Sequence, residues 1–258
     1  MKTPWLLPVL LIPCFGQCED KPRQRPDFVP ADVRLSSHPR AAAAAARVRP
    51  TLERDLWEKD MRLGEQVFLR AFKEERVLEI FVKRRAAEKF ELYRSYHVAG
   101  TSGSLGPKLA EGDGQVPEGF YYTGLNSLNP DSMYHLSFNI GYPNAYDRFH
   151  QRTGSHIMIH GNNISIGCLA MTDEKIEEIY TIVDAALRNG QPFVRVHVFP
   201  FRMTEERMAR ATENPNKPFW DNLREGHDLF EKSSIPPEAD VEQGRYAFKD
   251  AVAGPAGQ

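Results

Sequence analysis

Residues 155–172 read SHIMIHGNNISIGCLAMT and combine a strand pattern with a glycine-cysteine turn. Side chains of a strand alternate between its two faces, so the alternate residues from His156 to His160 are predicted to share one face while the isoleucines between them enter a core. Gly161 lets the chain leave the strand sharply, and a short turn brings it back at Cys168. The sequence therefore predicts that a thiol approaches the imidazole of His160.

A paired thiol and imidazole support nucleophilic catalysis, because the imidazole can take the thiol proton and stabilise the thiolate. Cys168 is therefore the candidate nucleophile and His160 the candidate general base. Gly167 leaves room for backbone N–H groups, those of Gly167 and Cys168, to face a developing oxyanion. His156 equally fits a supporting strand histidine, and Ser165 equally fits a turn-stabilising hydroxyl. A zinc site on these histidines and the thiol lacks a further ligand at matching spacing, so we predict no metal and no cofactor.

The segments on either side predict a mainly β structure with helices. Strand-like alternation covers residues 67–72, 77–82 and 90–93, which suggest a meander, and then 121–123, 134–140, 156–160 and 193–199. Dense glycine and proline between positions 100 and 119 predict an ordered loop with close backbone approaches. A helix is predicted from Thr172, as N-cap, to Leu187, with Asn189-Gly190 ending it. From Met203 onward the sequence predicts two short helices and an irregular tail.

The histidine-glycine strand end followed by SxGC resembles the catalytic motif of the L,D-transpeptidase (YkuD-type) family, which reads HG, a short turn and then S/T-x-G-C-x-R-M. The matching residues are His160, Gly161, Ser165, Gly167, Cys168 and Met171. Upstream segments resemble the YafK branch of this family: Gly106 to Lys108, Glu111 to Asp113, Pro117 to Tyr121 and Asn139 to Asp147. The resemblance covers about residues 65–245. Ala170 stands where the general pattern has an arginine.

This resemblance implies an α+β fold: a curved β-sandwich, a helix after the nucleophile loop and a small helical C-terminal extension. It also implies an enzyme in which Cys168 attacks a peptidoglycan stem peptide, forms a thioester and passes the acyl group to an amine during cell wall remodelling. Because Ala170 replaces the arginine, a hydrolase that releases peptidoglycan-linked lipoprotein stays open as an alternative. A peptidoglycan-binding module without turnover is a second alternative.

Four residues are candidates for substrate contacts: His156, Gly161, Ser165 and Tyr142. Tyr142 belongs to a group of tyrosines, with Tyr121 and Tyr146, that could line a peptide groove. Strand and loop tyrosines are more often core or rim residues. The sequence leaves these two readings of the tyrosines open.

The first residues predict an exported chain. Lys2 precedes an apolar run at positions 5–12 that is too short to cross a bilayer, so we predict a signal peptide at 1–17 and a periplasmic location. Lipid anchoring at Cys18 is less favoured, because Gln17 stands where such signals have a small residue. Cys168 is then the only cysteine of the body, and a lone thiol in an oxidising compartment points to a reactive group. No transmembrane helix is expected in the mature chain.

The remaining composition sets the domain boundaries and the partners. Residues 18–62 are rich in proline, arginine and alanine and predict a flexible tether, followed by a catalytic domain at 63–201 and a helical extension and tail at 202–258. A net charge of −2, from 33 Lys+Arg and 35 Asp+Glu, argues against a nucleic-acid partner. The expected partners are peptidoglycan stem peptides and, for the hydrolase, peptidoglycan-linked lipoprotein.

Overall fold

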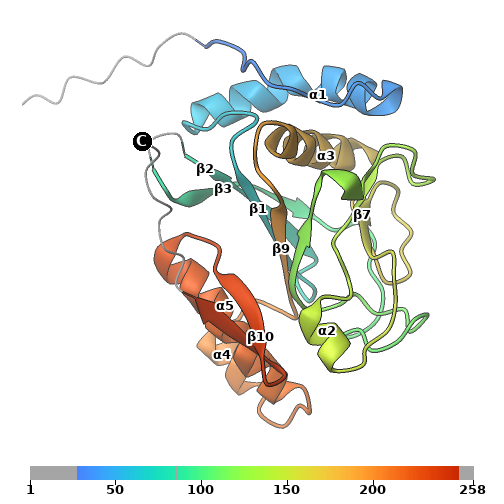
Figure 1. The fold of residues 1–258 in the computed structure, drawn as a ribbon, viewed down its shortest axis with the longest axis vertical. Coiled ribbons are helices and arrows are strands. Elements are labelled where there is room, and N and C mark those ends of the chain that lie inside the picture. The colour runs from blue at the N-terminus through green and yellow to red at the C-terminus, as the bar shows by residue number, and fades with distance from the viewer. Residues whose placement is uncertain (1–27, 85–86, 250–258) are drawn as a thin grey trace, which may run out of the picture.

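A five-stranded sheet, sheet A, lies at the centre of the computed structural model, which describes residues 28–84 and 87–249 (Figure 1). Its strands, in the order in which they pair, are β3 (Phe90–His97), β2 (Val77–Lys83), β1 (Val67–Phe72), β9 (Val194–Phe199) and β4 (Gly119–Thr123). Strands β1 and β9 are parallel, and the other neighbours are antiparallel. Strands β1 to β3 thus form the predicted meander.

A second sheet, sheet B, carries the candidate site. Its order is β5 (Leu128–Asn129), β6 (Ser137–Asn139), β7 (Met158–His160) and β8 (Leu169–Ala170), with β7 and β8 parallel. A 3-10 turn, η1 (Leu125–Ser127), precedes β5, and a short helix, α2 (Ala145–Phe149), lies between β6 and β7. Strands β6 and β7 are shorter than predicted, because His135 and His156 have φ angles of 67° and 54°, which no strand accommodates.

Helix α3 (Asp173–Arg188) packs between the two sheets, and its apolar face, from Ile176 to Leu187, is buried in the central core. The predicted helix and its end at Asn189-Gly190 are confirmed, with Gly190 at φ 114°. Thr172 occupies the N-cap position, but its side chain makes no capping hydrogen bond. The helix therefore begins where the sequence predicted, without the predicted capping contact.

The prediction of a flexible tether over residues 18–62 is wrong for its second half. Helix α1 (Pro39–Glu58) lies along α3 on the outside of the molecule (Figure 1) and buries one stripe of side chains: Ala41, Ala44, Ala45, Leu52 and Leu56. Residues 41–46 are all alanine, and a run of one small residue shows no apolar period that would predict a packed face. Alanine is the best helix former, and its small side chain lets two helices approach closely, so the run itself supplies the face.

The C-terminal part forms a smaller unit below sheet A (Figure 1), and an aromatic cluster that includes Trp220 of this unit and Phe199 of β9 joins it to the sheet. It contains α4 (Glu205–Ala209), α5 (Lys217–Ser233), β10 (Glu238–Glu242) and β11 (Arg245–Lys249). The two predicted helices are present, but the predicted irregular tail is a hairpin up to residue 249. Gln243 and Gly244 turn it with φ of 50° and 77°, a turn that suits the strand twist. Strand β10 contains several acidic residues, so it lacks the apolar alternation by which a strand is predicted.

The predicted signal peptide at 1–17 and Cys18 lie outside the described residues. Among the residues that are described, no helix combines the length and the apolar character needed to cross a membrane.

Candidate active site

Cys168 lies at the end of the nucleophile loop, residues 161–168, directly before strand β8, and it is partly exposed. Its Sγ accepts a hydrogen bond from the backbone N–H of Met158 at 3.4 Å and donates to the carbonyl oxygen of His156 at 3.7 Å. The thiol therefore lies against strand β7, and solvent can still reach it.

His160 ends strand β7, and its imidazole is buried, with 2% of the residue exposed. Nδ1 lies 2.6 Å from the carbonyl oxygen of Gly161. A carbonyl oxygen only accepts hydrogen bonds, so Nδ1 must carry the proton, and in the neutral imidazole Nε2 is left as the acceptor. The bond thus fixes the tautomer that a general base requires.

The parallel pairing of β7 and β8 brings the nucleophile loop back beside the strand that carries His160. His160 pairs with Ala170, and Cys168 lies two residues earlier, directly before β8, with its Sγ against the backbone of His156 and Met158. No hydrogen bond joins the imidazole and the thiol within the described residues. The approach of the thiol to the imidazole therefore stays a prediction.

The electrostatic environment keeps both members of the pair neutral at pH 7. Burial lowers the pKa of His160, against the Gly161 bond, which raises it. Burial also raises the pKa of the Cys168 thiol, against the Met158 N–H and the charge of Lys108, which lower it. The sequence suggested a thiolate held as an ion pair. These two directions instead favour a resting thiol and imidazole.

Two serine hydroxyls hold the backbone of the nucleophile loop. Ser165 Oγ accepts the Cys168 N–H at 2.9 Å and donates to the Cys168 carbonyl oxygen at 2.6 Å, and Ser102 Oγ accepts the Gly167 N–H at 2.6 Å. These are the two N–H groups that were predicted to bind an oxyanion. A substrate oxygen would have to replace the serine hydroxyls as acceptor, so the role of Gly167 stays a prediction. Gly167 itself has φ 91°, which suits glycine.

Three of the candidate substrate contacts, His156, Tyr142 and Gly161, differ in how far they are buried. His156 is exposed and outside strand β7, and its carbonyl rather than its imidazole meets the thiol. Tyr142 is 4% exposed, and its hydroxyl lies 3.2 Å from the carbonyl oxygens of Lys108 and Thr153, so the core reading of this tyrosine holds. Gly161 is buried without a positive φ. It is needed because a Cβ would lie 2.7 Å from the Tyr134 carbonyl oxygen.

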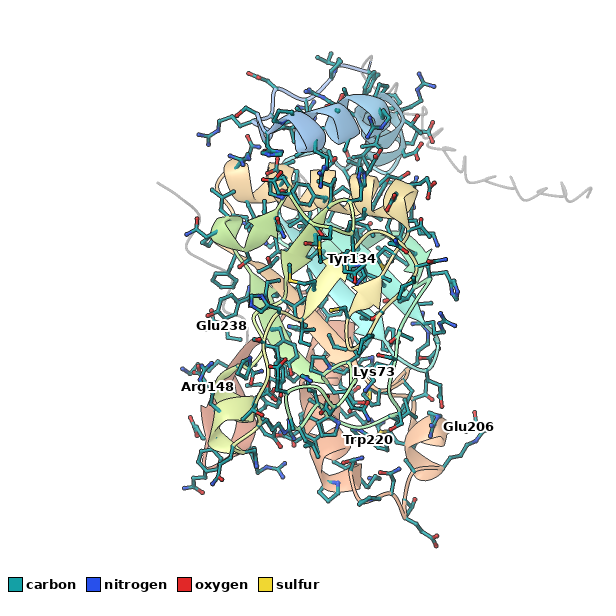
Figure 2. All side chains as sticks on the ribbon, turned by 90° about the vertical axis from the view of Figure 1, so that its right-hand side faces the viewer. Lys73, Tyr134, Arg148, Glu206, Trp220 and Glu238 are labelled. Atoms are coloured by element: carbon teal, nitrogen blue, oxygen red, sulfur yellow. The ribbon has the colours of Figure 1, made fainter. Side chains whose placement is uncertain are left out.

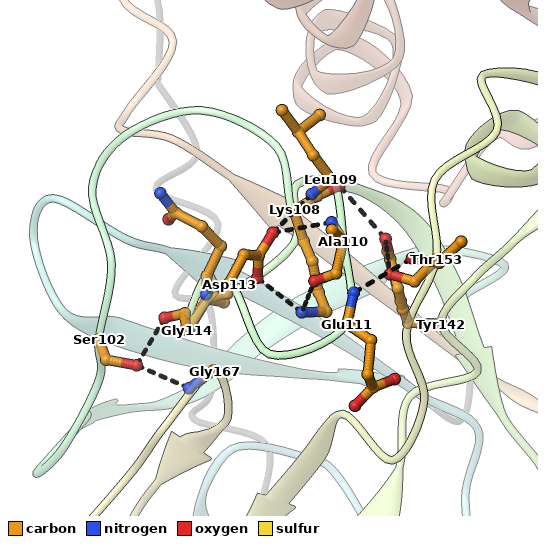
Figure 3. A network of polar contacts seen from close by, with 12 residues as sticks. Ser102, Lys108, Leu109, Ala110, Glu111, Asp113, Gly114, Tyr142, Thr153 and Gly167 are labelled. Carbon is orange, nitrogen blue, oxygen red and sulfur yellow. Dashed lines mark hydrogen bonds and ion pairs between the residues drawn. The ribbon is translucent and has the colours of Figure 1, made fainter.

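The glycine-rich segment, here the 98–118 loop, is ordered by a polar network beside the nucleophile loop (Figure 3). Ser102 links it to Gly167 and also donates to the Gly114 carbonyl oxygen at 2.8 Å. Asp113 pairs with Lys108 at 2.6 Å and accepts three backbone N–H groups. Burial works against ionisation of Asp113, but these hydrogen bonds lower its pKa to about 2. The loop therefore keeps a fixed shape next to the thiol.

Two residues of this environment were missed by sequence reasoning. Lys73 begins a run of charged residues, 73–76, that favours a solvated turn, yet it is 8% exposed, and its Nζ donates to the carbonyls of Gly106 and Val116 and to Glu118. Tyr134 was read as part of a strand. Its ring lies against the His160 ring, with centroids 4.7 Å apart and planes at 33°. A charged residue beside a turn carried no signal of burial, and no motif surrounds Tyr134.

Across residues 28–84 and 87–249, no three histidine, cysteine, aspartate or glutamate side chains gather in a way that could hold a metal ion.

Comparisons with known proteins show the family to which this chain belongs. The family described as YkuD, L,D-transpeptidase catalytic domain, matches residues 73–227. The curated proteins named "Putative L,D-transpeptidase YafK" from Escherichia coli strain K12 and from E. coli O157:H7 are each 47% identical over 188 residues, which are 73% of this chain and 76% of theirs. Among solved structures, the helical cell shape determining protein Pgp2 (K307A mutant) of Campylobacter jejuni aligns with a TM-score of 0.44 and 20% identity, covering 69% of this chain and 63% of that one. Bd1075 of Bdellovibrio bacteriovorus aligns with a TM-score of 0.40 and 16% identity, covering 69% and 78%.

Proposed function

Because this chain belongs to the L,D-transpeptidase catalytic domain family, which acts on peptidoglycan, we propose that it is an exported, periplasmic acyltransferase whose nucleophile is Cys168. The observation that carries the proposal is the geometry of two paired strands. His160 presents Nε2 as a proton acceptor, and Cys168 lies directly before β8, the strand that pairs with the one carrying His160. Proton acceptor and nucleophile are what acyl transfer requires.

The reaction begins when a stem-peptide carbonyl beside meso-diaminopimelate approaches the Cys168 thiol. His160 Nε2 takes the thiol proton while Sγ forms a bond to the carbonyl carbon, and the carbonyl electron pair moves to its oxygen. The Gly167 and Cys168 N–H groups donate hydrogen bonds to that oxyanion once it replaces the hydroxyls of Ser102 and Ser165. One such donor is typically worth about 3 kcal/mol of barrier.

The tetrahedral intermediate collapses when the peptide C–N bond breaks. His160 returns its proton to the leaving amine, and a thioester on Cys168 remains. An incoming amine then loses its proton to His160 Nε2, attacks the thioester and restores the thiol, which completes transpeptidation. The neutral resting state of both groups supports this sequence, since the proton is transferred only when substrate is bound.

Ala170 supports a second outcome, in which water rather than an amine takes the acyl group. The family pattern has an arginine at this position, whereas Ala170 is fully buried and pairs through its backbone with Gly100. A missing cation removes one means of binding a charged acceptor. A hydrolase of this kind would release peptidoglycan-linked lipoprotein with the same two catalytic residues.

Mass spectrometry of muropeptides tests the proposal. Muropeptides with and without attached lipoprotein are incubated with the wild type, Cys168→Ala, His160→Gln and the control His97→Gln, a histidine exposed at the end of β3. We expect new cross-links or released lipoprotein with the wild type and the control, none with Cys168→Ala, and a loss of at least about 100-fold with His160→Gln. Identical products from the wild type and Cys168→Ala would overturn the enzymatic assignment in favour of a binding module.

A further inference from the structure

The imidazole of His160 is covered by a short segment between β5 and β6, here the 130–136 loop. The Tyr134 ring lies against the imidazole, and the Leu136 carbonyl oxygen accepts the Gly161 N–H at 3.1 Å. Directly after the loop, Ser137 pairs with His160 across β6 and β7. The 130–136 loop therefore holds the Tyr134 ring over the imidazole and also holds the end of strand β7, which carries His160.

The backbone of the 130–136 loop contains an unfavourable conformation that contacts from other parts of the chain must stabilise. His135 has φ 67°, in the left-handed region that a residue with a Cβ adopts at a cost. Such a conformation persists only where surrounding contacts determine it. His135 Nε2 lies 2.7 Å from Glu177 Oε1 on helix α3, which is one of these contacts.

Helix α1 supplies the other contacts that support the 130–136 loop. The Arg40 guanidinium donates to the carbonyl oxygens of Ser132 and His135, at 2.8 and 2.9 Å, so one side chain holds two points of the loop, on either side of Tyr134. Arg47 donates to both oxygens of Glu177, at 2.5 and 3.0 Å, and thereby orients the carboxylate that His135 contacts. Although burial works against it, the bonds from Arg47 and His135 lower the pKa of Glu177, which keeps this carboxylate charged.

The position of α1 is itself fixed by packing and not by these arginines. Its alanine and leucine stripe is buried against α3, and the Ser36 N–H before it donates to Asp184 Oδ2 at 2.7 Å. Figure 2 shows Tyr134 on the face of the molecule below α1 and α3. Helix α1 lies outside the residues that match the family, 73–227.

We infer that α1 is a positioning element of the active site: through Arg40 and Arg47 it holds the 130–136 loop, and with it Tyr134, over the imidazole of His160. The inference rests on the proposed function, in which His160 is the general base. Arg40 and Tyr134 are positioning residues, because they act through His160 and the loop. The site is then complete only when this N-terminal helix is in place.

Tyr134 shields one face of the imidazole from water. Other titratable groups near this strand end are Cys168 before β8, Asp173 at the start of α3, whose Oδ1 accepts the Asn162 N–H, and His135 of the loop with its partner Glu177. Burial is the cause that lowers the pKa of His160. If the loop is released, water reaches the ring, the pKa of His160 rises toward its ordinary value, and the acidic limb of activity moves to higher pH.

The test is a double-mutant cycle in the full chain with Arg40→Ala, Tyr134→Ala and the double variant. Two controls are Tyr134→Phe, which keeps the ring, and Arg54→Ala, which removes an exposed arginine of the same helix that has no polar partner among the described residues. Melting temperatures check that the fold is intact. The readouts are kcat and KM against pH and the NMR titration of the His160 imidazole.

We expect Arg40→Ala and Tyr134→Ala each to raise the pKa of His160 and to lower kcat about threefold to tenfold near pH 6, with KM little changed. The double variant should be no worse than the worse single variant, since both act through one contact. Unchanged imidazole titration in both single variants, or effects that simply multiply, would overturn the inference. The NMR titration of His160 needs no turnover. It therefore tests this inference even if the muropeptide assay shows no activity and the proposed function fails.

Discussion

The two loops that flank the candidate catalytic pair are held in place by different means. On the thiol side, the 98–118 loop is closed by buried groups, with Glu118 fully buried and bonded to Lys73, to the Gly106 N–H and to the Trp220 Nε1–H. On the imidazole side, the 130–136 loop depends on Arg40, which is exposed and belongs to a helix far away in the sequence. Removing a partner from a buried pair is costly, whereas exposed contacts are weak and screened by salt.

This difference teaches that the 98–118 loop, beside Cys168, is held by the folded core. The 130–136 loop, beside His160, is held by surface contacts that can be removed without unfolding the protein. A change near Cys168 should therefore appear as lost stability or as a displaced nucleophile. A change near His160 should leave stability intact and alter the acidic limb of activity.

The largest expected effect comes from Glu118→Ala. It leaves the buried Lys73 ammonium without its carboxylate and removes the acceptor of two further donors, so the free energy of unfolding should fall by about 3 kcal/mol or more. The matched control is Glu88→Ala, which breaks an exposed pair with Lys83 and should cost less than about 1 kcal/mol. Urea denaturation measures both. Equal losses in the two variants would remove the contrast between a buried and a surface-held loop.

A smaller effect, confined to the reaction, is expected from Ser165→Ala. Ser165 Oγ holds both the N–H and the carbonyl of Cys168, so its loss should displace the nucleophile and lower kcat about tenfold, or about 1.4 kcal/mol of barrier. Stability should change little, because Ser165 is only partly buried. Ser155→Ala is the control, since Ser155 is exposed and contacts Glu111 at 3.4 Å. A Ser165→Ala enzyme with wild-type kcat would show that the turn needs no serine.

The same contrast explains what the sequence could predict. Residues 155–172 are contiguous, so alternation and glycine positions were enough to predict a strand that ends at His160 and a turn that returns the chain beside it. The meander and α3 were also predictable, because each is defined by a local apolar period. Elements that are defined by residues close together in the sequence are therefore the ones that a single sequence predicts best.

The base side could not be predicted, because its contacts join residues that lie far apart in the sequence. Arg40 meets carbonyls that are 92 and 95 residues away, and no pattern marks a backbone acceptor. Helix α1 itself was missed because the first half of its buried face consists of alanines, which apolar periodicity weights poorly. The burial of Lys73 was hidden in the same way, since its partners lie 33 to 45 residues later in the chain.

The smallest effect concerns the titration of the Cys168 thiol. It tests whether the pKa of Cys168 depends on the 130–136 loop as the pKa of His160 is expected to. Burial raises the pKa of Cys168, so in the absence of substrate the thiolate should form only above the ordinary thiol range near pH 9. The sign follows from the charged form: burial penalises the thiolate and leaves the thiol unaffected. The difference in ultraviolet absorbance near 240 nm between the wild type and Cys168→Ala, followed against pH, reports the thiolate directly. Tyr134→Ala should leave this curve in place, because Tyr134 contacts the imidazole and not the sulfur. A thiolate already present at pH 7 would mean that the pair rests as an ion pair, and the acidic limb would then belong to the two groups together.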